Sequence, residues 1–233
     1  MLDVNNLYVG YYKDLSILQG VTVKAEKGKI TAVLGANGVG KSTLLKAVYG
    51  FLKPTGGEVL LEGRNVTNIP PHQRVQLGIS YIMQQASIFP WMTVEENIQL
   101  GAWSFRKDKE RIRKKIDENY ESFPLLKDRK KTQTGKLSGG MQRMVEIARI
   151  LMSEPRLILV DEPTAGLAVI AAREVYHLLK DLKEEHKITI LLVDQDIRNA
   201  LKIADFVYVL DLGKNKFSGP SEEFTDLEKA FWV

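Results

Sequence analysis

A glycine-rich run at residues 35–42, GANGVGKS, contains the residue types that hold a phosphate group. It fits the pattern G-x-x-x-x-G-K-[ST] and lies between an apolar run, ITAVLG, and a helix-forming stretch, STLLKAVYG. Glycines let backbone N–H groups close around phosphate oxygens, and the N-terminus of the following helix adds positive partial charge. In this pattern the lysine reaches the terminal phosphates and the serine can bind Mg²⁺. We therefore predict a phosphate-binding loop with Gly35, Asn37, Gly38, Val39, Gly40, Lys41, Ser42 and Thr43.

Two consecutive carboxylates end a strand-like run, LILVDEP. A strand tip delivers neighbouring side chains to opposite sides, so one carboxylate can hold the Mg²⁺ shell while the next faces an attacking water. Asp161 fits the first role, through water, and Glu162 fits the second. Acidic residues at strand ends are common, but beside a phosphate loop this pair is strong evidence for hydrolysis.

A second glycine run, LSGGM, begins another helix-forming stretch much later in the chain. Ser138 is a suitable N-cap, and Gly139 and Gly140 let backbone donors approach an anion closely. A helix that served only for packing would not need two successive glycines at its start. The apolar spacing that follows predicts one buried stripe, formed by Met144, Val145, Ala148, Leu151 and Met152.

Composition argues against several other classes of function. There are no cysteines, and His72, His177 and His186 lie far apart without ligand-like spacing, which argues against thiol catalysis and zinc sites. Lys and Arg total 33 against 29 Asp and Glu, an excess too small to indicate a nucleic-acid partner. The longest apolar runs are far shorter than the roughly 20 residues of a spanning helix, and no signal peptide is evident. We expect a cytoplasmic chain that is not embedded in the membrane.

Strand and helix patterns alternate along the chain and predict an α/β fold with a mostly parallel sheet. VTVKAEKGKI and GEVLLEG add antiparallel β structure near the N-terminus, and FVYVLDLGKNKFSGP predicts a hairpin that turns near Gly213. The stretch 93–154 is rich in helix formers and charge, which predicts a helical subdomain that ends in the helix after LSGG. We expect one domain over 1–233, with an α/β core from 1–92 and 155–233.

The motifs resemble, in their order, those of the nucleotide-binding subunit of ABC transporters, and the resemblance covers essentially the whole chain. The matching stretches are GANGVGKS, Gln84 after ISYIM, LSGGM, LILVDEP, AGLA and VDQD. The resemblance implies a P-loop NTPase core with a mostly parallel sheet, an N-terminal antiparallel β subdomain and a helical subdomain. It also implies that ATP and Mg²⁺ bind and that ATP hydrolysis is coupled to transport across a membrane.

The resemblance implies roles for single residues as well. Tyr12 stacks on adenine, with Tyr11 as second choice, unless both are ordinary strand aromatics. Gln84 contacts Mg²⁺ or the hydrolytic water and senses the membrane partner, unless it is a plain loop amide. Glu162 is the general base, and Gln195 lies where many members of the family carry a histidine that contacts the γ-phosphate.

The same resemblance answers why a second glycine run is present. In such proteins two subunits meet head to tail, and the LSGG of one closes over the ATP that the phosphate loop of the other holds. The partners implied are a second ABC ATPase subunit, identical or related, integral membrane permease subunits and, indirectly, a solute-binding protein. The chain is then peripheral on the cytoplasmic face of the membrane. The residues that act on the partner's nucleotide are Leu137, Ser138, Gly139, Gly140 and Met141.

Two positions depart from the commonest pattern of the superfamily. Gln195 replaces the histidine, and Ala168 stands where an aspartate is usual after the acidic pair. A neutral amide hydrogen bond gives roughly 1 kcal/mol instead of the 1.5–3 kcal/mol of a charged donor. These departures favour slower hydrolysis, and they also leave open a module that binds nucleotide without hydrolysing it.

Both departures, with FPWMTVEENIQLGA and DEPTAGLA, look like the smaller ATP-binding subunit of branched-chain amino acid importers. The run Met83-Gln84-Gln85-Ala86-Ser87 differs from that subfamily, and QASIF is similar to the ATPase of lipopolysaccharide export. The apolar run Phe89-Pro90-Trp91-Met92 is either a docking surface for a membrane partner's helix or a cap of the helical subdomain.

Other classes of function fit the sequence less well. ABC ATPases of DNA repair carry a long coiled coil between the two glycine runs, and those of translation carry two cassettes, whereas this chain has neither. A kinase needs an acceptor site and a GTPase needs an Asn-Lys-x-Asp motif, and neither is found.

Overall fold

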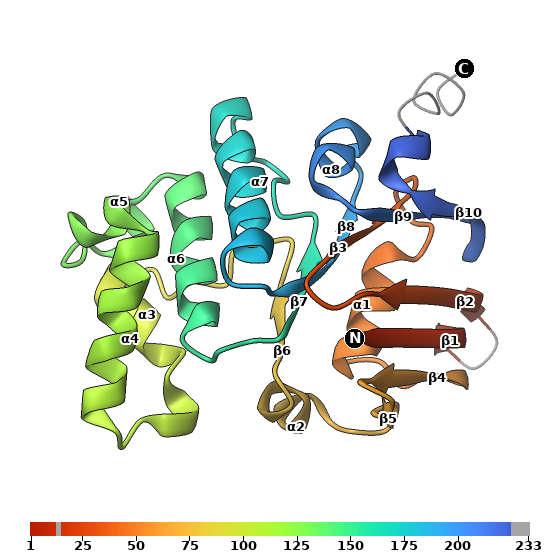
Figure 1. Ribbon diagram of the computed structural model, residues 1–233, viewed down its shortest axis with the longest axis horizontal. Helices are drawn as coiled ribbons and strands as arrows, with labels where there is room; N and C mark the ends of the chain where they lie inside the picture. Colours follow the sequence, from red (N-terminus) through yellow and green to blue (C-terminus); the bar gives the residue numbers. More distant parts are fainter. Residues whose placement is uncertain (13–14, 225–233) are drawn as a thin grey trace. The chain divides into compact units, whose positions relative to one another are not determined.

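The computed structural model describes residues 1–12 and 15–224, and its backbone contacts divide the chain into two units (Figure 1). The core unit carries both β-sheets, and the helical unit carries the helices between β6 and β7. The predicted division at residues 93 and 154 stays a prediction, because these units follow backbone contacts instead. The core unit comprises Met1–Tyr81, Arg156–Glu162 and the chain from Tyr176 onward; the helical unit comprises Ile82–Pro155 and Pro163–Val175.

A six-stranded sheet in the core unit has the order β10-β9-β3-β8-β7-β6 (Figure 1). β3 pairs in parallel with β8 and β9, β7 pairs in parallel with β8, and β10 is antiparallel to β9. Every residue of β3, β7 and β8 is buried, as the continuous apolar runs predicted. The strands are β3 (Ile30–Leu34), β6 (Ile79–Ile82), β7 (Leu157–Asp161), β8 (Thr189–Asp194), β9 (Phe206–Asp211) and β10 (Lys214–Pro220).

The second sheet is antiparallel, in the order β2-β1-β4-β5 (Figure 1). Alternate side chains of β1, such as Leu2 and Val4, are fully buried, and a register shift between Val4 and Leu7 keeps the later residues Leu7 and Val9 on the buried face. The predicted antiparallel part near the N-terminus is therefore confirmed. Its strands are β1 (Leu2–Tyr12), β2 (Leu15–Ala25), β4 (Gly56–Leu61) and β5 (Arg64–Asn65).

Helix α1 (Lys41–Tyr49) packs between the two sheets and joins their cores. It contacts β1 and β2 of one sheet and β7 and β8 of the other. Leu44 of α1 belongs to the same buried cluster as Val23 of β2 and Leu191 of β8. The helix ends at Gly50 in the left-handed conformation, and this glycine is the last residue of the helix-forming stretch STLLKAVYG. The core unit also contains α2 (Pro71–Gln76), α8 (Ile197–Ile203) and η3 (Ser221–Phe224).

The hairpin predicted near Gly213 is confirmed. β9 and β10 are antiparallel, with Asp211 opposite Lys214, and the turn between them has both Leu212 and Gly213 at positive φ. A Cβ at Gly213 would lie 2.0 Å from the carbonyl oxygen of Ile17, so this position requires glycine.

The helical unit is built around contacts of α6 with α3 and α5 (Figure 1). Thr93 begins α3 with a capping box, because its side chain accepts from the N–H of Glu96 while the Glu96 carboxylate accepts from the N–H of Thr93. No helix in the described part of the chain has the length and apolarity needed to cross a bilayer. The elements are α3 (Val94–Leu100), η1 (Trp103–Phe105), α4 (Lys109–Ser122), α5 (Pro124–Lys127), η2 (Thr134–Lys136) and α6 (Gly139–Leu151), followed across both units by α7 (Val169–Glu184).

The predicted buried stripe of α6 is only partly correct. Val145, Ala148 and Met152 are buried, but Met144 and Leu151 are half-buried. The other buried side chains of this face include two charged ones, Arg143 and Glu146. The apolar spacing could not indicate them, because charged residues at helical spacing are typical of a solvated face.

Arg74 of α2 is a buried cation whose side chain donates to four main-chain carbonyls. Its side chain is 1% exposed. Nε donates to the carbonyl of Ile69 at 2.7 Å and Nη2 to that of Thr67 at 2.8 Å, while Nη1 donates to the carbonyls of Ala47, at 3.0 Å, and Val48 near the end of α1. Burial lowers the pKa of the guanidinium to about 10, so it stays charged at neutral pH.

We expect Arg74→Met to lower the free energy of unfolding by about 3 kcal/mol, because buried carbonyls lose their donors. Urea unfolding followed by circular dichroism measures the change. The matched control is Arg64→Met, because Arg64 is exposed on β5 and its replacement should change stability by no more than about 0.5 kcal/mol. Equal stability of the two variants would contradict the role of Arg74.

Candidate phosphate-binding site

The phosphate-binding loop follows β3 and leads directly into α1, and its glycines are required by its shape. Gly35 has φ +152°, and a Cβ there would lie 2.5 Å from the carbonyl oxygen of Leu210 on β9. Gly40 has φ +104°, and its Cβ would lie 2.6 Å from a methyl of Leu18 on β2. The loop therefore lies against both sheets, and its exposed residues Ala36, Asn37 and Gly38 face solvent.

Lys41 begins α1, and its ammonium is held at the loop. The residue is 4% exposed, and Nζ donates to the carbonyl of Gly35 at 2.9 Å and to that of Ala36 at 3.0 Å. The carboxylate of Glu162 lies 3.6 Å away. An ammonium has three donors, so this one can also reach an anion that binds at the loop.

Asp161, the last residue of β7, is buried with both carboxylate oxygens engaged. Oδ1 accepts from the hydroxyl of Ser42 at 2.8 Å, and Oδ2 accepts from the hydroxyl of Tyr81 at 2.8 Å. Burial, together with the charge of Asp161, raises the pKa of Tyr81, so this hydroxyl stays a donor. A serine hydroxyl beside a carboxylate is the hard-oxygen donor set that suits Mg²⁺.

Glu162 follows β7 in a left-handed backbone conformation, with φ +40°. Its N–H donates to the carbonyl of Val193 on β8 at 2.9 Å, and only 8% of the residue is exposed. A non-glycine residue held in this conformation stores strain of the kind that clusters at functional sites. The turn directs the carboxylate of Glu162 toward Lys41, while the preceding carboxylate of Asp161 contacts Ser42.

Gln195 directly follows the end of β8, and the carboxylate of Asp194 stabilises the turn that contains it. Asp194 accepts from the N–H of Gln195 at 2.8 Å and of Asp196 at 3.0 Å, and also from the hydroxyl of Tyr176 at 2.7 Å. Burial raises the pKa of Asp194, although these hydrogen bonds act in the opposite direction. The side chain of Gln195 is exposed.

Three of these residues, Tyr81, Asp194 and Tyr176, were not predicted as part of a site. The VDQD motif contains Asp194, and its place at the end of a buried strand was a signal for it. The two tyrosines contact carboxylates far away in the sequence, so no local pattern marks them. Tyr12 belongs to β1, but its side chain lies outside what the structure describes.

The residues of LSGGM belong to the helical unit. Ser138 is the N-cap of α6, and its hydroxyl accepts from the N–H of Met141 at 3.4 Å. Ser138 and Gly139 are exposed, whereas Leu137 and Gly140 are buried. A Cβ at Gly140 would lie 2.8 Å from the Cβ of Ala171. Gly140 therefore has a packing reason of its own, which the sequence argument left out.

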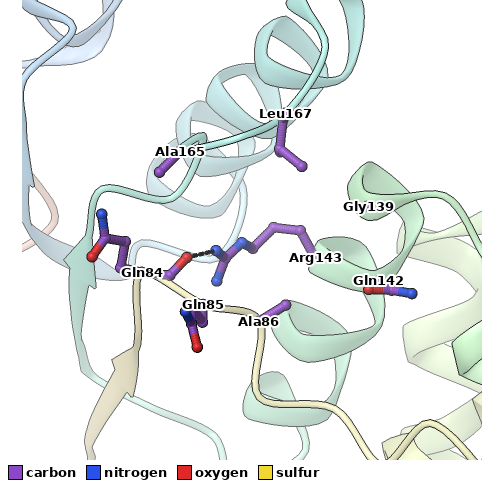
Figure 2. Close-up of a pocket in the computed structure, with 8 residues that line it drawn as sticks. All are labelled: Gln84, Gln85, Ala86, Gly139, Gln142, Arg143, Ala165 and Leu167. Atoms are coloured by element: carbon purple, nitrogen blue, oxygen red, sulfur yellow. Dashed lines mark hydrogen bonds between the residues drawn. The ribbon is translucent and has the colours of Figure 1, made fainter.

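Gln84 follows β6 and borders a cavity of about 440 Å³ in the helical unit. Figure 2 shows that the cavity lies between the loop after β6, the start of α6 and the segment before α7. The guanidinium of Arg143 donates to the carbonyl of Gln84 at 2.6 Å (Figure 2). The lining residues are Gln84, Gln85, Ala86, Gly139, Gln142, Arg143, Ala165 and Leu167.

The fold and the loop define a P-loop nucleotide-binding ATPase cassette. The family described as ABC transporter matches residues 18–165, and the chain belongs to this family. The chain is 40% identical to the probable branched-chain amino acid transport ATP-binding protein LivF of Archaeoglobus fulgidus, over 98% of this chain and 96% of that protein. It is 38% identical to BraG, a high-affinity branched-chain amino acid transport ATP-binding protein of Pseudomonas aeruginosa, over 88% and 86% of the two chains.

Relatives with other transport functions, and solved structures, are also similar. The lipopolysaccharide export ATP-binding protein LptB of Haemophilus influenzae is 33% identical over 94% of this chain and 90% of its own. The ADP conformation of MJ1267, an ATP-binding cassette of an ABC transporter, has a TM-score of 0.88 and 30% identity, covering 100% of this chain and 95% of that one. A dimeric cassette, MJ0796 bound to ADP and Pi, has a TM-score of 0.82 and 27% identity, covering 95% and 99%.

The chain is therefore an ABC ATPase that binds ATP and whose hydrolysis of ATP energises a membrane transporter. The predicted fold class is confirmed, as is the resemblance to the ATPases of branched-chain amino acid transport. A kinase, a GTPase and a module without ATPase activity are thereby set aside. The roles of individual site residues stay predictions.

Proposed function

We propose that the chain is the ATP-hydrolysing subunit of an importer of branched-chain or other hydrophobic amino acids. The support is the 40% and 38% identity to LivF and BraG over most of the chain, together with Gln195 and the AGLA sequence. The second candidate is export of a lipid or lipopolysaccharide, supported by the 33% identity to LptB and by QASIF.

The observation that carries the proposed mechanism is the cluster of Lys41, Ser42, Asp161 and Glu162 at the phosphate loop. Backbone N–H groups of the loop hold the phosphates, and Lys41 contacts the terminal ones. When bound, Mg²⁺ supplies charge neutralisation of the phosphate oxygens. Ser42 would hold it directly, and Asp161 through water.

Glu162 acts as the general base in this mechanism. Its carboxylate takes a proton from the attacking water, and it lies 3.6 Å from the ammonium of Lys41. Gln195 donates a neutral hydrogen bond to the γ-phosphate, on a turn that Asp194 orients. Gln84 contacts Mg²⁺ or the attacking water, and Tyr12 stacks on adenine.

We expect Glu162→Gln to lower kcat for ATP hydrolysis by roughly 10²–10⁴-fold, because the amide cannot accept the proton. The affinity for ATP should change little, since the phosphate loop is intact. Phosphate release and fluorescent-nucleotide titration measure the two quantities. Glu185→Gln, an exposed change of the same type, serves as control. Wild-type activity of the Glu162 variant would remove Glu162 from the mechanism.

The LSGGM residues act on the nucleotide of a second ATPase subunit. The exposure of Ser138 and Gly139 at a helix N-terminus supports this, because the positive end of the helix then faces out of its own unit. The similarity to a dimeric cassette bound to ADP and Pi supports it as well. The LSGGM residues of that second subunit, whether it is identical or related, in turn act on the nucleotide that this chain holds.

Ser138→Arg tests this action in trans. The long side chain should block the partner's phosphate, so nucleotide-dependent dimerisation and hydrolysis should both be lost, while ATP affinity of the monomer stays within about twofold. Dimerisation is measured by light scattering with and without ATP. The measurement uses a Glu162→Gln background, because that variant should retain bound nucleotide. Ser122→Arg, at the exposed end of α4, is the control. Loss of ATP binding by the monomer would instead mean that LSGGM acts within its own chain.

We propose that the run from Phe89 to Met92 binds the integral membrane permease subunits. The chain then lies peripherally on the cytoplasmic face of the membrane. A solute-binding protein is an indirect partner, through the permeases. Phe89 is 51% exposed and Trp91 84% exposed. The run is also firmly held, because the buried amide of Asn97 bonds to both main-chain groups of Phe89, and the buried hydroxyl of Thr134 donates to the Phe89 carbonyl. A fixed, exposed apolar loop suits a helix from a partner.

Trp91→Glu should abolish assembly with the permeases and leave ATP hydrolysis by the isolated subunit unchanged. Co-purification with the permease subunits when they are produced together with this chain, and the ATPase rate of the free subunit, measure the two effects. Trp103→Glu provides the control, because Trp103 is 66% exposed on η1 of the same unit and does not belong to this run. A Trp91 variant that assembles as the wild type does would exclude docking at this loop.

A further inference from the structure

The loop Met83–Ser87, which carries Gln84, is held by side chains of α6. Nη1 of Arg143 donates to the carbonyl of Met83 at 2.7 Å, and Nη2 donates to that of Gln84 at 2.6 Å (Figure 2). A guanidinium presents several donors in a fixed plane, so two bonds from one side chain define both the position and the tilt of the main chain on either side of Gln84.

Glu146, one turn further along α6, holds the other end of the loop. One oxygen of its carboxylate accepts from the N–H of Ser87 at 3.2 Å and from the hydroxyl of Ser87 at 3.1 Å. The other oxygen lies 2.5 Å from Nη1 of Arg143. Arg149 adds hydrogen bonds from the next turn to the carbonyl and, at 2.7 Å, the hydroxyl of Ser87. The loop is therefore attached at both ends to one face of one helix.

The burial of this pair is not explained by stability alone. The side chains of Arg143 and Glu146 are 3% and 0% exposed. Removing two charges from water is so costly that apolar residues of similar volume usually stabilise a fold equally well. In addition, Nε of Arg143 is buried without a hydrogen-bond partner among the described residues. What apolar side chains could not supply is the set of hydrogen bonds to the main chain at Met83, Gln84 and Ser87.

We propose that Arg143 and Glu146 are positioning residues for ATP hydrolysis, which fix the backbone of Gln84 to the first turns of α6. The proposal rests on the function proposed above and on the role of Gln84 in it. Because Ser138 and Gly139 begin the same helix, Gln84 and the LSGG residues then form one rigid body. Closure of LSGG over a partner's nucleotide displaces Gln84 with it, and the Arg143–Glu146 pair transmits the movement.

The decisive variant replaces both charges, Arg143→Met with Glu146→Met. Neither charge is then left buried alone, so the unfolding midpoint should stay close to that of the wild type. The amides of residues 83–87 should exchange hydrogen about tenfold faster, because the Ser87 N–H and the loop carbonyls lose their partners. The kcat of ATP hydrolysis should fall by roughly 10–100-fold, while KM for ATP changes less than about twofold.

Two further variants make the test specific. Arg111→Met with Glu154→Met removes an ion pair of the same unit that is 2.8 Å long but about half exposed, and it should change neither kcat nor loop exchange. Arg143→Lys keeps the charge opposite Glu146 but loses the planar fork, so it should lower kcat at unchanged KM even if the double variant does not fold.

The proposal is overturned if loop exchange accelerates and kcat stays at the wild-type value, or if kcat falls without faster exchange of residues 83–87. Full activity and a protected loop in the Arg143→Lys variant would overturn it too. Failure of the proposed function has a different signature: the wild type would release no phosphate, or hydrolysis would not depend on Glu162, whereas loop exchange would still report the contact.

Discussion

Parallel pairing of β3, β7 and β8 is the constraint on which the site depends. Leu34 lies opposite Asp194, and Asp161 lies opposite Val193, so the three strands end at one edge of the sheet. All three strands are buried on both faces, and their charged residues, Asp161 and Asp194, each occur where a strand ends. The phosphate loop, the acidic pair and the turn of Gln195 each follow directly from one of these ends. The pairing of the strands therefore brings these three segments together at one edge of the sheet.

Three sets of buried charged side chains in the described part of the chain differ in their partners. Arg74 donates to main-chain carbonyls of Ala47, Thr67 and Ile69. Lys41 donates to the carbonyl of Gly35 in the phosphate loop, and its ammonium also lies near the carboxylate of Glu162. Arg143 and Glu146 compensate each other, and their remaining bonds go to a loop. Lys41 is the member of these sets that belongs to the phosphate-binding loop. Buried ionic groups are in general weak evidence for stability, so the partners of each set are the more informative feature.

Much of the core unit was predictable because its signals are local. Strand-like apolar runs marked β3 and β7, glycine spacing marked the phosphate loop, and the stretch FVYVLDLGKNKFSGP marked the hairpin near Gly213. The failures have a common cause, which is that long-range contacts leave no local pattern. Arg143 and Glu146 have the spacing of a solvated helix face, and only the loop packed on them makes them interior. Tyr81 and Tyr176 are ordinary aromatic residues until the strands bring Asp161 and Asp194 within reach.

The start of α6 combines requirements that the sequence alone could not separate. Gly140 is buried, and a Cβ there would lie 2.8 Å from the Cβ of Ala171. Gly139 is exposed, but a Cβ there would lie 2.9 Å from a methyl of Leu167, so both glycines also have a packing reason. The Ser138 hydroxyl accepts from a single N–H of that turn, so further donors remain directed outward. One turn later in the same helix, Arg143 donates to the carbonyls of Met83 and Gln84. An α-helix is stiff over so short a length. A contact that displaces the first turn of α6 should therefore displace the loop Met83–Ser87 as well. In the proposed mechanism, the second glycine run and the loop of Gln84 therefore move together.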